Sequence, residues 1–305
     1  MHVLIFGGTQ FVGRHMAEEG ERRGHQLTLA HRGKTNPDLF PQAEHVTLDR
    51  LESVDVLRGR TFDAILDVSA YVPRAVRLAR EALAEGFGRY LFISTISVYD
   101  LAAMGAITHP DESAPLLKPE DPTVETINAE TYGGLKVLCE RELADLGDRL
   151  TIIRPGIVVG RYDHTNRFHH WTREILTRDA VAVPPRLDQP SQWIDGEDLA
   201  RLTWDLLENA TPGAFNACGP GTPETLGSML NGIAAATDRN PTWIPAEAEE
   251  LPKMRFLLPE DGSADAMFRV SNAKAISAGL RFRPFAETVA DVAAEIRAEL
   301  PQTSN

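Results

Sequence analysis

Short apolar runs alternate with amphipathic stretches through the first half of the chain. The apolar runs predict β-strands over residues 3–6, 26–31, 45–48, 63–67, 89–94 and 150–154. The amphipathic stretches between them predict helices, which are clearest at 11–23, 73–85 and 132–146. Because strands that alternate with helices form a parallel sheet covered on both faces, the pattern predicts an α/β fold with a doubly wound parallel sheet. Ligands of such sheets bind at the carboxyl ends of the strands.

The alternation loosens after Pro155, which predicts a second, smaller lobe. Residues 192–195 predict a strand that returns to the sheet, and 196–208 predict a helix. Proline and glycine turns run through residues 219–285, and 286–300 predict a terminal helix. These boundaries give a sheet domain (1–155 plus about 191–217), a C-terminal substrate lobe (about 156–190 and 218–285), and a terminal helix with a tail (286–305).

Composition narrows the class of protein. The 305 residues are 43% hydrophobic and 25% charged, and the formal net charge is −13. The chain has no run of basic residues that would displace counterions from phosphates, so we expect no nucleic-acid partner. It has no apolar run long enough to span a membrane, and its N-terminus enters a predicted strand with no room for a signal peptide. The two cysteines, Cys139 and Cys218, fit a reducing compartment, so a cytoplasmic protein is expected.

The turn after the first predicted strand has the form of a phosphate-binding loop. It reads Gly7-Gly8-Thr9-Gln10-Phe11-Val12-Gly13, with Gln10 where a fuller motif has a third glycine. Glycine lets the main chain approach a pyrophosphate closely, and the following helix N-terminus offers free N–H groups. The context of strand, turn and helix therefore predicts a Rossmann-type dinucleotide site. A tight turn without a ligand is the alternative.

The end of the second predicted strand bears on which dinucleotide binds. Proteins that prefer NAD usually place an Asp or Glu there for the ribose 2′-hydroxyl. This chain instead has His31-Arg32-Gly33-Lys34, with no acid between Glu21 and Asp38. Two cations suit the additional phosphate of NADP, so NADP is the preferred cofactor and NAD the alternative. The alternative is that these residues form a basic loop that is exposed to solvent and binds no cofactor.

Tyr132 and Lys136 are four residues apart on a predicted helix, so they share one face. An ammonium near a phenol lowers the pKa of the phenol, which then exchanges a proton with a carbinol oxygen while hydride moves to or from a nicotinamide. Ser94 and Thr95 end a predicted strand at the same edge of the sheet, where a hydroxyl can bond the substrate oxygen. Capping of the next turn is the structural alternative for both hydroxyls.

These motifs resemble those of a known superfamily. The combination is Gly7-Gly8-x-x-Phe11-Val12-Gly13, then Ser94-Thr95-x-x-Val98-Tyr99, then Tyr132-x-x-x-Lys136, then Arg154-Pro155-Gly156. In this order it resembles the short-chain dehydrogenase/reductase superfamily, and more closely the extended and atypical branch with the NAD-dependent epimerase/dehydratases. Two features depart from the family pattern, namely Gln10 and the interval of 37 residues from Thr95 to Tyr132. The additional residues in that interval predict a flap over the site.

The resemblance implies roles for further residues and a quaternary state. Thr95, Tyr132 and Lys136 match the catalytic set, and the cofactor segments match Asp49, Arg50, Val68, Ser69, Ala70, Ser94, Pro155, Gly156 and Ile157. Many members of the superfamily pair through the helices beside the catalytic helix, which implies a homodimer.

The segment after the nicotinamide motif is the candidate substrate region. The residues we expect to line the pocket are Tyr162, His164, Arg167, Phe168, Trp171, Gln192 and Trp193. Rings together with Arg and His suit a polar, ring-shaped substrate. Arg255 and Arg269 are candidates to hold a substrate phosphate, although surface arginines are the plainer reading. The three histidines at 164, 169 and 170 lack a known ligand spacing, so no metal is expected.

Three functions remain open from the sequence. The first is an NAD(P)-dependent oxidoreductase that transfers hydride at a carbinol or ketone carbon of a polar, sugar-like small molecule. The second is an NAD-dependent sugar-nucleotide epimerase or dehydratase, which the whole-chain resemblance favours and the basic loop at 31–34 opposes. The third is a non-catalytic NADP-binding sensor or an RNA-binding atypical member, which the Tyr132–Lys136 pair and the net charge of −13 oppose.

Overall fold

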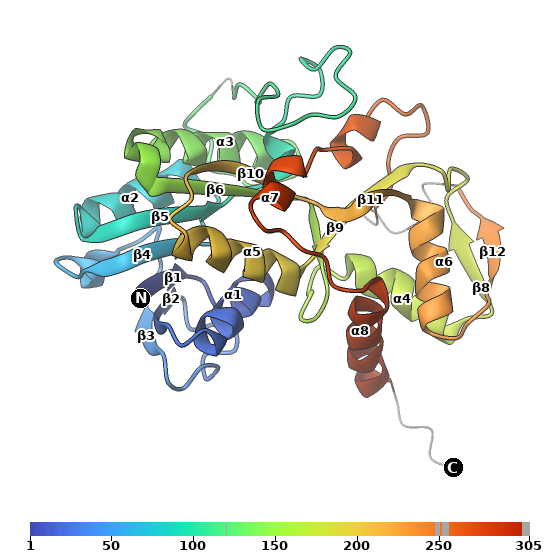
Figure 1. The fold of residues 1–305 in the computed structure, drawn as a ribbon, viewed down its shortest axis with the longest axis horizontal. Coiled ribbons are helices and arrows are strands. Elements are labelled where there is room, and N and C mark those ends of the chain that lie inside the picture. Colours follow the sequence, from blue (N-terminus) through green and yellow to red (C-terminus); the bar gives the residue numbers. More distant parts are fainter. Residues whose placement is uncertain (120, 248–250, 252–255, 301–305) are drawn as a thin grey trace.

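The computed structural model describes residues 1–119, 121–247, 251 and 256–300. Its centre is a seven-stranded parallel sheet with the strand order β10-β6-β5-β4-β1-β2-β3 (Figure 1). The strands are β1 (His2–Phe6), β2 (Gln26–His31), β3 (Glu44–Thr47), β4 (Phe62–Asp67), β5 (Phe87–Ile93), β6 (Leu150–Pro155) and β10 (Gly213–Ala217). The strand order reverses direction between β1 and β4, which is where ligands of such sheets bind.

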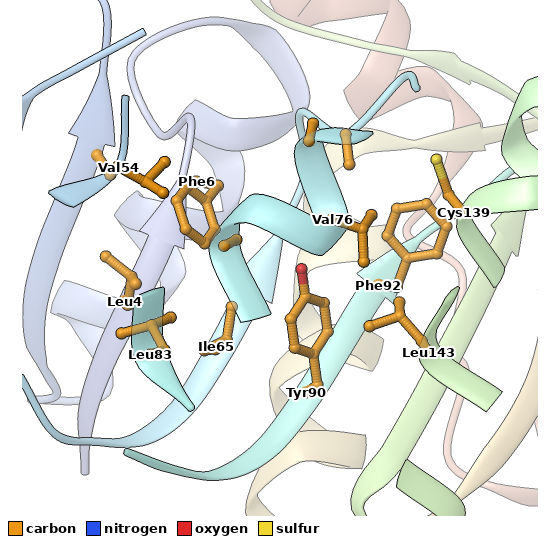
Figure 2. Close-up of a cluster of buried hydrophobic side chains, with 14 of the residues drawn as sticks. Leu4, Phe6, Val54, Ile65, Val76, Leu83, Tyr90, Phe92, Cys139 and Leu143 are labelled. Atoms are coloured by element: carbon orange, nitrogen blue, oxygen red, sulfur yellow. The ribbon is translucent and has the colours of Figure 1, made fainter. Parts of the chain in front are cut away.

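Helices cover both faces of this sheet. One face packs against α2 (Pro73–Leu83) and α3 (Tyr132–Leu143), and the other against α1 (Phe11–Arg22) and α5 (Gly196–Glu208). Figure 2 shows the core beneath α2 and α3, where strand residues such as Phe6 and Phe92 meet Val76 of α2 and Leu143 of α3. Because the central strands are buried on both faces, they are the near-continuous apolar runs that made them predictable.

Six predicted strands of the sheet and the doubly wound fold are confirmed, but the seventh strand differs from the prediction. Residues 192–195 lie in β9 (Pro190–Asp195), which pairs with β7 (Ile157–Val159) and β11 (Gly219–Thr225) in a separate small sheet. The strand that joins the main sheet beside β6 is β10. The carboxylate of Asp195 caps α5 by accepting a hydrogen bond from the N–H of Glu197, so β9 leads directly into that helix.

The rest of the chain builds the smaller lobe. Its core joins α4 (Arg167–Thr177), α6 (Leu226–Ala236) and α8 (Phe285–Glu299), with the pair β8 (Ala180–Val183) and β12 (Thr242–Pro245) beside them. The short helix α7 (Ala273–Ser277) lies against β10. Short 3₁₀ segments are η1 (Asp55–Leu57), η2 (Ile96–Val98), η3 (Ala144–Arg149) and η5 (Asp265–Phe268). Within the described residues, none of the helices is both long and apolar enough to cross a membrane.

Candidate active site and dinucleotide cavity

The glycine turn forms a cradle at the carboxyl end of β1. Gly7 and Gly8 have φ of +107° and +102°, a region that disfavours any side chain. A Cβ atom at Gly13 would lie 2.6 Å from the backbone nitrogen of Gly8, so only glycine allows α1 to approach this closely. Gln10 is the N-cap residue of α1 and has extended backbone angles. The cradle is thus intact with Gln10 in the position of the missing glycine, and the N-terminus of α1 points at it.

A cavity of about 480 Å³ opens from this cradle across the carboxyl ends of β1, β2, β3 and β4. Its lining includes residues expected to bind the cofactor, namely Gly7, Gly8, Thr9, Gln10, Phe11, Val12, Gly13, His31, Arg32, Lys34, Asp49, Arg50, Val68 and Ser69. It also includes Tyr71, Ile127 and His164, none of which was predicted from the sequence to bind the cofactor. Ala70, Ser94, Pro155, Gly156 and Ile157 are not among the described lining residues of the cavity.

The basic loop after β2 borders the cavity with exposed cations. The side chains of Arg32 and Lys34 are both exposed and both line the cavity. Among the described residues, neither side chain has an ion pair with a carboxylate. Asn36 ties the loop to the glycine turn by donating from its side-chain nitrogen to the carbonyl oxygen of Thr9 (3.0 Å). The two cations are therefore available to an anionic ligand.

Arg50 lines the cavity, but its guanidinium has a structural role that the resemblance did not imply. It bonds both oxygens of the buried Asp67 carboxylate, at 2.6 and 2.8 Å, and stacks 4.2 Å from the ring centroid of Phe6. Tyr90 donates to the same carboxylate (2.6 Å). Burial acts to raise the pKa of Asp67, yet the Arg50 guanidinium outweighs burial and keeps this pKa below its ordinary value. Arg50 thus fixes the end of β4 rather than pointing at a ligand.

The three candidate catalytic residues are not among the described lining residues of this cavity, but two of them lie next to Tyr71, which is: its ring centroid is 6.2 Å from that of Tyr132 and 5.5 Å from Nζ of Lys136. Tyr132 begins α3, and Thr95 follows β5 and caps η2 by accepting a hydrogen bond from the N–H of Ser97 (3.1 Å). The Thr95 side chain lies close enough to Tyr132 to act on the pKa of its phenol. Lys136 is buried one turn further along α3, and its Nζ donates to the carbonyl oxygens of Ala70 (2.9 Å) and Ile93 (2.6 Å). Two hydroxyls and an ammonium are thereby gathered at the ends of β4 and β5.

The pKa of Tyr132 differs from the expectation that Lys136 lowers it. Burial raises the pKa of Tyr132 to about 12, against smaller lowering effects from Thr95 and Arg167. Burial also lowers the pKa of Lys136 to about 8. The ammonium is engaged with two main-chain carbonyls, so the phenol gains little from it in the free protein. Tyr132 is consequently a neutral phenol at neutral pH.

Ser94 faces away from the cavity into a buried ion pair. Its hydroxyl donates to Glu140 (2.5 Å), and the Glu140 carboxylate is bound by Arg154 at 3.0 and 2.7 Å. Arg154 also donates to the hydroxyl of Tyr99 (3.1 Å). Glu140 lies on α3 one turn after Lys136, so this network joins the catalytic helix to β5 and β6. The resemblance implied cofactor contact for Ser94, whereas the structure gives its hydroxyl this supporting position.

The interval between Thr95 and Tyr132 borders the cavity, as a flap would. Ile127 lines the cavity, and Glu125 forms a two-pronged ion pair with Arg74 of α2 (2.8 and 2.6 Å). Arg74 also donates to the carbonyl oxygen of Leu51, another residue of the cavity lining (2.7 Å). These contacts hold the segment beside the end of the cavity where β3 ends.

Most of the predicted substrate residues have other partners. Phe168, Trp171 and Trp193 are buried in the core of the smaller lobe, and the Trp193 ring nitrogen donates to Glu224 (2.9 Å). Gln192 exchanges two hydrogen bonds with the main chain of Val270. Tyr162 stacks under Arg14, whose guanidinium carbon is 3.5 Å from the ring centroid.

Two predicted substrate residues remain at the site. His164 lines the cavity, and Arg167 acts electrostatically on Tyr132. Arg269 lies near Asp265 (3.6 Å), and Arg255 falls outside the described residues. Among the described residues, no cluster of three or more His, Cys, Asp or Glu side chains has the arrangement of a metal site. Of the residues expected to bind the substrate, His164 and Arg167 therefore remain candidates.

Comparison with known proteins adds a family to this geometry. Residues 72–218, which carry the catalytic helix and the strands beside it, match the model of the NAD dependent epimerase/dehydratase family. The match confirms the resemblance to this family that the sequence motifs indicated. This family is one of NAD-dependent enzymes, in agreement with the class of enzyme that the motifs predicted. The epimerase/dehydratase match also ends at Cys218, directly after β10, and so takes in the strand that completes the sheet.

One relative in sequence and two solved structures illustrate what this chain is similar to. The chloroplast stem-loop binding protein of 41 kDa b from Arabidopsis thaliana is 25% identical over 235 residues, which cover 71% of this chain and 58% of that protein. UDP-glucose 4-epimerase of Thermus thermophilus, solved in complex with NAD, is 19% identical with a TM-score of 0.72, covering 98% of this chain and 100% of that one. UDP-glucuronic acid 4-epimerase of Bacillus cereus, also solved with NAD, is 15% identical with a TM-score of 0.71, covering 97% and 96%. Because these identities are 19% and 15%, the similarity to the solved structures establishes the fold alone.

Proposed function

We propose that the protein is an NAD(P)-dependent oxidoreductase that interconverts a carbinol and a ketone on a polar, sugar-like small molecule. The observation that carries the proposal is the meeting of Thr95, Tyr132 and Lys136 beside a cavity that ends in a glycine cradle. The bound nicotinamide would supply or accept the hydride. Every other group needed for the reaction belongs to this chain.

The proton side of the reaction falls to Tyr132 and Thr95. In the reducing direction a ketone oxygen gains a proton as its carbon gains hydride, and Tyr132 is a protonated phenol that can donate it. The hydroxyl of Thr95, which acts to lower the pKa of Tyr132, would bond the same substrate oxygen. Lys136 lies one turn further along α3, and its ammonium would stabilise the phenolate that remains once it leaves the two carbonyls that hold it in the free protein. In the oxidising direction the same groups take the proton back.

Arg32 and Lys34 support NADP as the cofactor. Both are exposed, line the cavity and follow the strand where NAD-binding proteins usually carry an acid. A phosphate on the ribose would provide the missing anionic partner for both cations. Arg167, which acts on Tyr132, and His164 at the cavity wall would bind polar groups of the substrate.

A second candidate is a sugar-nucleotide epimerase or dehydratase that retains NAD and returns the hydride within one cycle. The family match favours it, and so does the naming of the structural relatives as UDP-sugar epimerases. The two candidates share Tyr132 and differ in the fate of the cofactor. One exchanges its dinucleotide with solution at every turnover, whereas the other keeps it bound.

The first experiment identifies the nucleotide. Freshly purified protein is denatured, and any released nucleotide and its redox state are determined. If none is released, melting temperatures are compared with added NADP and NAD, because a ligand that binds only the native state raises them.

A site that NADP stabilises selectively supports the oxidoreductase. Tightly retained NAD supports the epimerase or dehydratase and refutes the NADP assignment. No nucleotide and no shift would favour a binding protein, the class to which the name of the Arabidopsis relative points.

Two sets of variants separate the roles of these residues. Tyr132→Phe should lose most turnover with polar ketones or sugar nucleotides while cofactor affinity stays unchanged, because the phenol donates the proton and the ring remains. The double change Arg32→Ala and Lys34→Ala should weaken NADPH binding about tenfold or more and leave NADH binding nearly unchanged. Arg58→Ala, which removes an exposed arginine outside the cavity lining, is the control for the double change. Full turnover in Tyr132→Phe would refute the proposed chemistry.

A further inference from the structure

Two histidines form a chain of hydrogen bonds at the base of the basic loop. His31 ends β2 and His45 lies in the neighbouring strand β3. His45 pairs in register with Leu29, two residues before His31, so both imidazoles lie on the same face of the sheet. The Nε2 atom of His31 and the Nδ1 atom of His45 are 2.8 Å apart.

The partners of the two rings determine where the protons lie. Nε2 of His45 is 3.1 Å from the carbonyl oxygen of Phe40, which can only accept, so this nitrogen carries hydrogen. Nδ1 of His31 is 3.0 Å from the N–H of Gly33, which can only donate, so this nitrogen carries a lone pair. With both rings neutral, Nε2–H of His31 donates to Nδ1 of His45. All four ring nitrogens then have a partner.

The two imidazoles and their hydrogen bonds join the two ends of the loop that carries Arg32 and Lys34. Gly33 lies between Arg32 and Lys34 and has a φ of +69°, a conformation that favours glycine. Phe40 lies at the far end of the loop and is buried. The imidazoles therefore hold the start of the loop through the Gly33 N–H and its end through the Phe40 carbonyl.

A positive charge on either imidazole would break this series of hydrogen bonds. A proton added to His31 would face the Gly33 N–H, and one added to His45 would face the Nε2–H of His31, so either costs a hydrogen bond. Burial, and then the neighbouring His45, lowers the pKa of His31. The loop contributes the cations Arg32 and Lys34 and the acid Asp38, and β3 contributes Glu44, which binds Arg60 and Thr28 instead. The hydrogen-bond geometry is therefore satisfied when both rings are neutral.

We propose that His31 and His45 are positioning residues for cofactor selectivity, acting as a neutral clamp that presents Arg32 and Lys34 to the 2′-phosphate of NADP. The inference rests on the proposed dinucleotide site. The clamp has no direct role in hydride transfer, because its contacts are with the loop and not with Thr95, Tyr132 or Lys136.

The test compares dissociation constants for NADPH and NADH, measured by nucleotide fluorescence. His31→Leu removes the acceptor of the Gly33 N–H and should weaken NADPH binding about two- to tenfold, the range of one hydrogen bond, with NADH nearly unchanged. His31→Asn is the conservative variant, because its side-chain oxygen can accept the same N–H and should restore NADPH binding. His45→Leu should behave like His31→Leu, and His45→Gln should recover part of the loss by bonding Phe40.

Each outcome decides a separate claim. Wild-type protein that binds neither nucleotide, or binds NADH alone, would refute the proposed NADP site and with it the clamp. Wild-type protein that prefers NADPH, together with an unchanged ratio in His31→Leu and His45→Leu, would refute the clamp alone. Equal losses for both nucleotides would also refute it, since they indicate general damage to the fold. If the leucine variants do not fold, a loss in His45→Gln that is absent in His31→Asn still supports it, and unchanged ratios in both refute it.

Discussion

The buried ion pair of Glu140 and Arg154 lies beneath the candidate active site, and breaking it should cost stability. Glu140 and Arg154 are only 6% and 4% exposed, and the carboxylate accepts two bonds from the guanidinium and one from Ser94. Glu140→Gln keeps the volume of the side chain but removes its charge. It also turns one oxygen into a donor that faces another donor. Arg154 is then a buried cation without a counter-charge.

The size of the effect follows from this burial. Removing one partner of a buried ion pair typically costs about 3–5 kcal/mol, because the remaining charge has lost its partner and its water. At about 2–4 °C for each kcal/mol, the melting temperature of Glu140→Gln should fall on the order of 10 °C. The control is Glu85→Gln, which breaks the pair with Arg149 at 3.4 Å, where Glu85 is 89% exposed. Exposed pairs contribute about 1 kcal/mol at most, so the melting temperature of the control should fall by no more than about 4 °C.

The assay is thermal unfolding of the three proteins under identical buffer and nucleotide conditions. A double variant, Glu140→Leu with Arg154→Met, should be less destabilised than Glu140→Gln, because no unpaired charge remains. If Glu140→Gln unfolds no earlier than Glu85→Gln, the ion pair does not support this region as described. If the double variant is the less stable of the two, the loss comes from packing and hydrogen bonds and not from the unpaired charge.

Two further changes test the cradle and the helix α5. Gly13→Ala places a Cβ 2.6 Å from the Gly8 nitrogen, so the rise in melting temperature with added nucleotide should disappear; an undiminished rise would show that the cradle does not hold the ligand. Burial raises the pKa of Asp198 to about 6, so this group stabilises the fold below its unfolded pKa near 3.8, and that contribution is lost as pH rises through 6. Asp198→Asn should therefore gain up to about 3 kcal/mol relative to wild type between pH 4 and pH 7 in urea unfolding, whereas a pH-independent difference would contradict the burial argument.

The elements of the sheet were predictable because their signals are local. β1, β4 and β5 are buried on both faces and read as apolar runs. β10 reads Gly-Ala-Phe-Asn-Ala, too short and too polar to stand out, and its place beside β6 depends on a tertiary pairing. The strand over 192–195 was predicted correctly, but it pairs with β7 and not with the main sheet. An apolar run in the sequence does not specify which strand it pairs with.

The candidate site divides in the same way. The glycine turn and the spacing of Tyr132 and Lys136 can be read from the sequence, since each lies within a single turn of chain. Arg50 and its partner Asp67 are 17 residues apart, and nothing local joins them. The burial of Phe168 and Trp171 did have a signal, because with Ile175 they repeat at intervals of three and four residues on the buried face of α4. Their position directly after the nicotinamide motif favoured the pocket instead.

The state of Tyr132 and Lys136 bears on when the chemistry can begin. In the free protein, burial keeps the phenol protonated, and two strand-end carbonyls hold the ammonium. Those carbonyls belong to Ala70, three residues after β4, and to Ile93, the last residue of β5. A dinucleotide that extends from the glycine cradle toward Tyr132 must pass this point, where it can exchange hydrogen bonds with Lys136. Binding would then free the ammonium to act on the phenol, so that Tyr132 changes from a proton donor alone into a group that can also accept a proton.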